Sequence, residues 1–176
     1  MIIKKEFYFV RHGQTDYNAS SAKVDHADVS LNTMGLKQAQ DIEPIIASLS
    51  IKSVCYSPLK RAKETKEILS ARLAATQYEI PELGECTSQI WRDMTTYGSD
   101  AYESPHTHVK AFMNQVVHGI NQALSFEDPV LIVAHGGTHW ATCCLMGITD
   151  HNWIIDNCLP VHFFIGHDSQ WKAQTL

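Results

Sequence analysis

Three short apolar runs in the sequence each end in residues that suit the binding of an anion. These residues are Arg11 and His12 after residues 7–10, Ser57 and Pro58 with the nearby Arg61 after residues 53–56, and His135, Gly136 and Gly137 after residues 130–134. Arginine offers phosphate a planar pair of N–H donors, and neutral imidazole is a nucleophile near neutral pH. Glycine lets backbone approach a ligand closely, and a helix N-terminus aims N–H groups at negative charge. The pattern therefore predicts phosphate chemistry.

The elements that would position these residues follow from the periodicity of apolar side chains. Strands are expected at 7–10, 53–56, 77–80, 130–134 and 161–165, and helices at about 33–48, 57–74, 108–124 and 138–146. Residues 81–106 have few periodic apolar positions and are expected to be irregular. Alternating strands and helices predict an α/β fold, a three-layer α/β/α sandwich with a mostly parallel sheet, as one domain over residues 1–176. Ligands bind beyond the carboxyl ends of such strands, so the three polar strand ends should meet.

Composition narrows the class of protein. Apolar residues make up 44% and charged residues 19%, a balance typical of a globular domain, and the net charge of −5 argues against nucleic-acid binding through bulk basic charge. No apolar run approaches the roughly 18 residues that cross a bilayer. The N-terminus lacks the features of a signal peptide and is interpreted as the mature start. Five cysteines, an odd number without CxxC spacing, favour reduced thiols and a cytoplasmic location.

Five motifs, taken in order, resemble those of one known family. They are V-R-H-G-Q-T-x-x-N at 10–18, D-V-x-L-x-x-x-G-x-x-Q-A at 28–39, S-P-L-x-R-A-x-x-T at 57–65, L-x-E at 83–85 and V-A-H-G-G at 133–137. Together they look like the histidine phosphatase superfamily, which includes the cofactor-dependent phosphoglycerate mutases and fructose-2,6-bisphosphatases. The resemblance spans residues 7–137 and implies the phosphoglycerate mutase-like fold.

The resemblance also implies roles for individual residues. His12 would be the nucleophile that forms a phosphohistidine, and Glu85 the proton donor to the leaving group. Arg11, Arg61 and His135 would surround the phosphoryl group, with further donors from Asn18, the Gly136 backbone N–H and Thr15, although Thr15 could instead pack the phosphate loop. No metal and no cofactor would be required. The expected activity is hydrolysis of a phosphomonoester, carried by a small molecule or a phosphopeptide.

Several alternatives remain open at this point. Glu82 competes with Glu85 as the proton donor, because the residues after 85 depart from the family pattern. The chain could be a phosphoglycerate mutase, or a non-catalytic phosphate-binding module. His26, His106 and His108 could bind a metal or line the pocket, although we favour ordinary surface histidines. Residues 19–27 and 86–108 are expected to frame the mouth of the pocket, with Trp91, Arg92, Tyr97 and Tyr102 as candidate substrate contacts.

Overall fold

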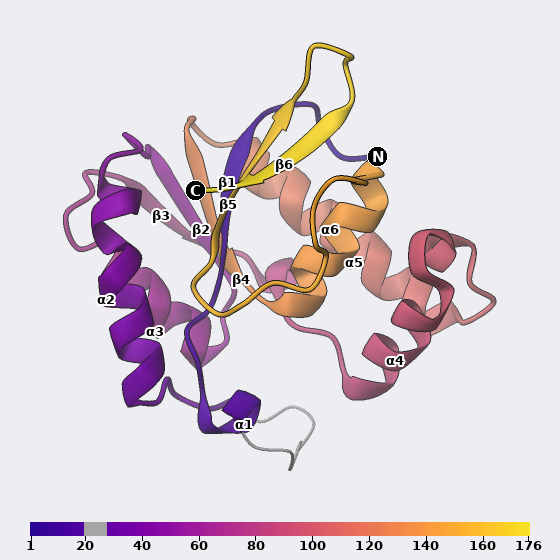
Figure 1. Ribbon diagram of the computed structural model, residues 1–176, viewed down its shortest axis with the longest axis horizontal. Helices are drawn as coiled ribbons and strands as arrows, with labels where there is room; N and C mark the ends of the chain where they lie inside the picture. Colours follow the sequence, from indigo (N-terminus) through magenta and orange to yellow (C-terminus); the bar gives the residue numbers. More distant parts are fainter. Residues whose placement is uncertain (20–27) are drawn as a thin grey trace.

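A single six-stranded sheet forms the centre of the computed structural model, which describes residues 1–19 and 28–176 (Figure 1). The strands are β1 (Phe7–Arg11), β2 (Ser53–Tyr56), β3 (Thr76–Glu79), β4 (Val130–Ala134), β5 (Pro160–Ile165) and β6 (Trp171–Thr175). Their order across the sheet is β3-β2-β4-β1-β5-β6. The predicted strands are therefore present, and β6 is an additional strand that the sequence pattern did not indicate.

Most of the sheet is parallel, as predicted. β4 pairs in parallel with both β1 and β2, and β2 pairs in parallel with β3. β5 runs antiparallel to β1, and β6 antiparallel to β5. Because β1, β2 and β4 run in the same direction, their carboxyl ends lie at one edge of the sheet, where the polar motifs follow them.

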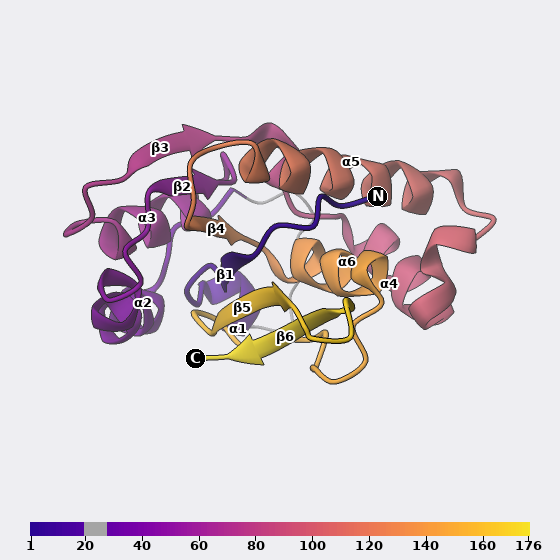
Figure 2. The ribbon, with the colours of Figure 1, turned by 90° about the horizontal axis from the view of Figure 1, so that it is seen from above.

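Helices cover both faces of the sheet and complete the three predicted layers (Figure 2). The helices are α1 (Asp16–Ala19), α2 (Thr33–Ala47), α3 (Lys60–Leu69), α4 (Ser88–Tyr97), α5 (Thr107–Leu124) and α6 (Gly136–Met146), with short 3₁₀ turns η1 (Pro81–Leu83) and η2 (Gly98–Glu103). α2 and α3 lie on one face, and α5 and α6 on the other. None of the helices in the described ranges is long and apolar enough to cross a membrane.

The core is divided into two parts by the alternation of side chains along the strands. Val10 and Val133 belong to the smaller cluster, with Ile46 of α2 and Leu69 of α3. Neighbouring strand residues such as Phe9 point the other way, into the larger cluster that contains the buried side chains of α5 and α6. Successive strand residues face opposite sides, so fully apolar strands such as β4 are those covered on both faces.

Two predicted boundaries differ from the structure. The helix expected over 57–74 is α3, which spans only Lys60–Leu69, because residues 70–75 return the chain to the start of β2, where Thr76 pairs with Ser53. The segment expected to be irregular over 81–106 contains α4 together with η1 and η2, so that prediction is wrong. Ile90, Trp91 and Met94 of α4 do follow helical spacing and pack against the core, but this apolar pattern is confined to one short stretch between polar residues.

Candidate active site

A cavity of about 510 Å³ lies beyond the carboxyl ends of β1 and β4. Arg11, His12, Arg61, Glu85 and Gly136 all line it, so the structure brings together residues from four of the predicted motifs. Tyr17, Trp91, Ile154 and Ile155 form part of the remaining wall. The site thus combines a charged floor with a partly apolar rim.

His12 is buried, and its imidazole is fixed in one tautomer. Its Nδ1 lies 2.7 Å from the Gly13 carbonyl oxygen, which can only accept a hydrogen bond, so Nδ1 carries the proton. Nε2 therefore has the free lone pair, and the Nε–H of Arg61 donates to it over 3.1 Å. Burial first, and then the positive charge of Arg61, holds the pKa of His12 well below its usual value. The residue is neutral, as a nucleophile must be.

The backbone around His12 is tied to three other parts of the fold. Its N–H donates to Ala134 at the end of β4, over 3.0 Å, and its carbonyl accepts from Asn157 Nδ2 over 2.7 Å. The next N–H, of Gly13, donates to Thr65 Oγ1 of α3 over 3.0 Å. These bonds hold the end of β1 against β4, α3 and the loop that carries Asn157.

Two arginines supply positive charge at the cavity floor. Arg11 Nη1 donates to the Ile155 carbonyl over 2.6 Å, and burial lowers the pKa of Arg11 and of Arg61 from their ordinary value. Glu85 opposes that lowering at both residues. Burial strengthens the interaction of these charges with a bound anion, because water screens them less.

His135 lies beside His12, with ring centroids 5.2 Å apart. It is fully buried, and its Nε2 lies 2.7 Å from Ser57 Oγ at the end of β2. Within the described part of the chain, His135 Nδ1 and Arg11 Nε are buried atoms without a hydrogen-bond partner. Burial, and then the neighbouring His12, holds the pKa of His135 well below its ordinary value. It is therefore a neutral group.

Glu85 reaches the cavity from the loop before α4. Its Oε1 accepts two backbone hydrogen bonds, from Cys86 N and Gly137 N, each at 3.0 Å. Burial nevertheless dominates and raises the pKa of this carboxyl above its ordinary value. With Oε1 engaged by two donors, Oε2 is the oxygen that can carry a proton. Such a carboxyl suits general acid–base chemistry near neutral pH.

Glu82 is placed differently from Glu85. It lies in η1, and its backbone and Cβ lie so close to Gly119 of α5 that a Cβ added there would be 3.1 Å from the Cβ of Glu82. Glu82 does not line the cavity, whereas Glu85 does. The geometry therefore favours Glu85 of the two candidates.

Of the other residues predicted to contact phosphate, Gly136 lines the cavity and Thr15 does not. Gly136 begins α6, so its N–H is among those without a partner inside the helix. Thr15 is fully buried, and it is not one of the residues that line the cavity. Asn18 belongs to α1, but its side chain lies outside what the structure describes, and so does His26 with the rest of residues 20–27.

Several contributors to the site escape the motif-based prediction. Tyr17 and Ile154 line the cavity, and Asn157 holds the His12 carbonyl. Of the four residues expected at the mouth of the pocket, Trp91 lines it, whereas Arg92, Tyr97 and Tyr102 do not. Tyr17 could have been inferred from its place within the first motif. Ile154 and Asn157 carry no local sequence signal, because only the tertiary fold brings their loop to the site.

Comparison with known proteins decides the family. The family model of the histidine phosphatase superfamily (branch 1) matches residues 7–171, nearly the whole chain. The chain belongs to the histidine phosphatase superfamily. The family predicted from the five motifs is therefore confirmed.

Several curated relatives of this chain are named as phosphatases. The uncharacterized phosphatase PhoE of Bacillus subtilis is 31% identical over 136 residues, covering 72% of this chain and 69% of that protein. The adenosylcobalamin/alpha-ribazole phosphatase of Salmonella typhimurium is 27% identical over 148 residues, covering 74% and 73% respectively. The glucosyl-3-phosphoglycerate phosphatase of Mycolicibacterium vanbaalenii is 28% identical over 174 residues, covering 85% and 77%. These relatives support the predicted class of phosphoric monoester hydrolase.

Solved structures confirm the fold. The alpha-ribazole phosphatase of Shigella flexneri superposes with a TM-score of 0.69 at 20% identity, covering 98% of this chain and 96% of that one. The phosphoserine phosphatase of Entamoeba histolytica gives a TM-score of 0.73 at 15% identity, covering 97% and 95%. The predicted phosphoglycerate mutase-like α/β fold is thus correct.

Proposed function

We propose that this chain hydrolyses phosphomonoesters in two steps through a phosphohistidine on Nε2 of His12. The observation that carries the proposal is the hydrogen bond of 2.7 Å between His12 Nδ1 and the Gly13 carbonyl. It leaves the lone pair of Nε2 available in a buried, neutral ring between two arginines. Attack by Nε2 on phosphorus requires this protonation state.

In the first step the phosphoryl group binds against Arg11, Arg61, His135 and the Gly136 N–H. Arg61 exchanges its bond to Nε2 for bonds to phosphoryl oxygens, and a bound anion would supply acceptors for the unpartnered Arg11 Nε and His135 Nδ1. Nε2 attacks phosphorus in line with the leaving oxygen. Charge on the equatorial oxygens is stabilised by the fixed donors.

Glu85 serves both steps in this proposal. Protonated on Oε2, it gives its proton to the leaving oxygen as the P–O bond breaks. The alcohol departs, and the resulting carboxylate accepts a proton from the water that attacks the phosphohistidine. Inorganic phosphate then leaves, His12 is neutral again and Glu85 is again protonated.

The rim of the cavity indicates the class of substrate. Tyr17, Trp91 and Ile154 line the space beyond the phosphate position, and Ile154 is 60% exposed. Such a rim favours a small-molecule phosphomonoester whose leaving group presents an aromatic or apolar face. Among the lining residues that the structure describes, Arg11 and Arg61 are the cationic ones. A mutase must hold a bisphosphorylated intermediate, so this charge supports a phosphatase better than a mutase.

A substrate panel tests the proposal. Phosphate release by the wild type and by His12→Ala should be measured for p-nitrophenyl phosphate, alkyl phosphates, sugar phosphates, nucleoside phosphates and phosphopeptides. We expect turnover by the wild type alone, with the highest kcat/KM for a small molecule that carries a ring. His118→Ala, which removes an exposed histidine on α5, is the matched control and should keep full activity. Equal turnover by His12→Ala would refute the proposal.

We also propose that residues 1–176 act as one domain in the cytoplasm. All five cysteines are free thiols, which suits a reducing compartment. Fractionation of cells that produce the tagged chain would test the location.

A further inference from the structure

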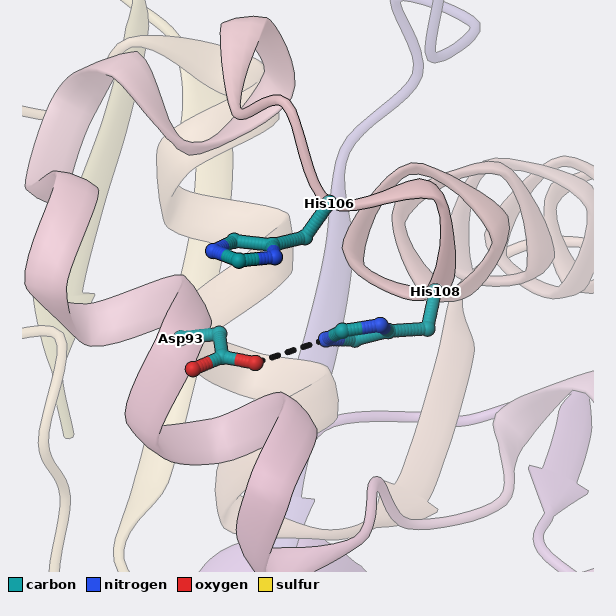
Figure 3. A group of neighbouring side chains, drawn as sticks. All are labelled: Asp93, His106 and His108. Carbon is teal, nitrogen blue, oxygen red and sulfur yellow. Dashed lines mark hydrogen bonds and ion pairs between the residues drawn. The ribbon is translucent and has the colours of Figure 1, made fainter.

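Three side chains that can ligate a metal ion lie together where α4 meets the start of α5, and none of them lines the catalytic cavity (Figure 3). Asp93 belongs to α4, His106 is the residue before α5, and His108 is the second residue of α5. One ligand atom from each lies within 4.8 Å of the other two. His108 Nε2 already lies 2.7 Å from Asp93 Oδ2, within hydrogen-bond distance.

We propose that Asp93, His106 and His108 bind a divalent transition-metal ion, for which Zn²⁺ is the best match. Two imidazoles and one carboxylate form a donor set that zinc favours, whereas Mg²⁺ and Ca²⁺ prefer all-oxygen sites. Tetrahedral ligands about 2.0–2.2 Å from zinc lie roughly 3.4 Å from one another. The ligand atoms of the three residues lie between 2.7 Å and at most 4.8 Å apart, a range that includes this value. Small side-chain rotations that move these atoms by about 1 Å would therefore form the site.

The arrangement of the two histidines supports a shared metal ion better than a simple contact between His108 and Asp93. Their rings lie side by side, with centroids 5.3 Å apart and an interplanar angle of 31°, and both face the same carboxylate (Figure 3). A hydrogen bond of 3.2 Å from the His106 N–H to the buried Ser104 Oγ fixes the turn that presents His106. His106 is exposed, and the side chains of His108 and Asp93 are 35% and 22% exposed. An ion can therefore enter, and water can take the fourth position.

The proposed ion would tie α4 to the core. α5 is anchored by buried residues such as Val109 and Phe112, whereas Met94 is the buried residue of α4. Trp91 lies two positions before Asp93, a spacing that puts the two on different sides of a helix, so Trp91 faces the cavity while Asp93 faces α5. Metal bound at Asp93 would thus fix the helix that forms part of the substrate wall. In this proposal His106 and His108 bind metal, the alternative to ordinary surface histidines.

Metal titration of the chelator-treated protein tests the proposal. We expect Zn²⁺ to bind with one equivalent per chain by isothermal titration calorimetry. Co²⁺ should give the visible absorption of a four- or five-coordinate ion and compete with Zn²⁺. Zinc at 100 times its Kd should raise the melting temperature by about 5–10 °C. His106→Ala, His108→Ala and Asp93→Asn should each weaken zinc binding by about 100-fold or more, because changing a direct ligand costs at least as much as losing an outer-shell partner.

Two control variants separate this site from the other histidines of the chain. His118→Ala removes an exposed histidine of the same helix, and His12→Ala removes one from the catalytic cavity; both should bind zinc as the wild type does. Wild-type affinity in the three cluster variants, loss of the bound equivalent in His12→Ala, or no binding at all would overturn the proposal. Phosphatase activity of the metal-free protein is a separate readout and should persist whichever result is found.

Discussion

Replacing Gly137 by alanine should disable the general acid without altering any reacting group. A Cβ at Gly137 would lie 2.5 Å from Cys86 Sγ and closer still to Glu85 Oε1. To regain an ordinary contact of at least 3.4 Å, the Glu85 carboxyl must move by about 1 Å, which also stretches its bond to the Gly137 N–H. A misplacement of that size typically costs about 10²-fold in rate.

The assay should compare two leaving groups in single-turnover experiments. An alkyl phosphate needs a proton as its bond breaks, so we expect Gly137→Ala to slow its phosphorylation step by about 10²-fold. p-Nitrophenolate can leave unprotonated, and its step should change by less than about fivefold. Gly136→Ala is the comparison, because a Cβ there meets Arg11 atoms only at 3.5 Å or more and does not touch Glu85. Its effect should be equal for both substrates. If both substrates phosphorylate a folded Gly137→Ala protein at wild-type rates, Gly137 does not position the general acid.

Other predictions concern the charges and protons of the site. Arg11→Ala and Arg61→Ala should each lower kcat by roughly 10²-fold or more in initial-rate measurements, and lysine at either position should restore only part of the activity. A near-normal kcat in either alanine variant would mean that phosphate binds elsewhere. In single-turnover kinetics, Glu85→Gln should slow phosphorylation by alkyl phosphates far more than phosphorylation by p-nitrophenyl phosphate, whereas Glu82→Gln should change neither rate appreciably. The reverse pattern would assign the general acid to Glu82. Burial and then Arg61 lower the pKa of His12, so Arg61→Gln should raise that pKa and move the acid limb of kcat/KM to higher pH; an unmoved limb would contradict this coupling.

The sequence was sufficient to predict the parts of the molecule that have strong local signals. Continuous apolar runs identify β1 and β4, and because parallel strands end at one edge, the polar residues after them had to meet. α4 was missed because its apolar pattern is confined to Ile90, Trp91 and Met94 within an otherwise polar segment, and β6 was missed because it alternates weakly beside β5. The predicted end of α3 was wrong, because the pairing of β3 with β2 decides where that helix must stop.

Contacts between distant segments lay beyond the reach of sequence patterns. The bond from the Gly137 N–H to Glu85 joins residues 52 positions apart, and the same fold places Ile154 at the cavity rim. Both Glu82 and Glu85 closely precede α4 in the sequence, and the fold separates them by packing Glu82 against Gly119 and placing Glu85 at the cavity. The proximity of Asp93 to His106 and His108 was likewise hidden, because only the packing of α4 against the start of α5 brings these residues together.

Trapping the phosphoenzyme would show whether His12 carries the phosphoryl group during turnover. The enzyme should be mixed with radiolabelled p-nitrophenyl phosphate, quenched within milliseconds and split between acid and base before the labelled peptide is sequenced. We expect one label per chain, on His12, which is lost in acid and stable in base. It should be absent in His12→Ala and, because Glu85 also activates water, should accumulate in Glu85→Gln. Label on a serine, cysteine or aspartate, or turnover without any phosphoenzyme, would contradict this expectation.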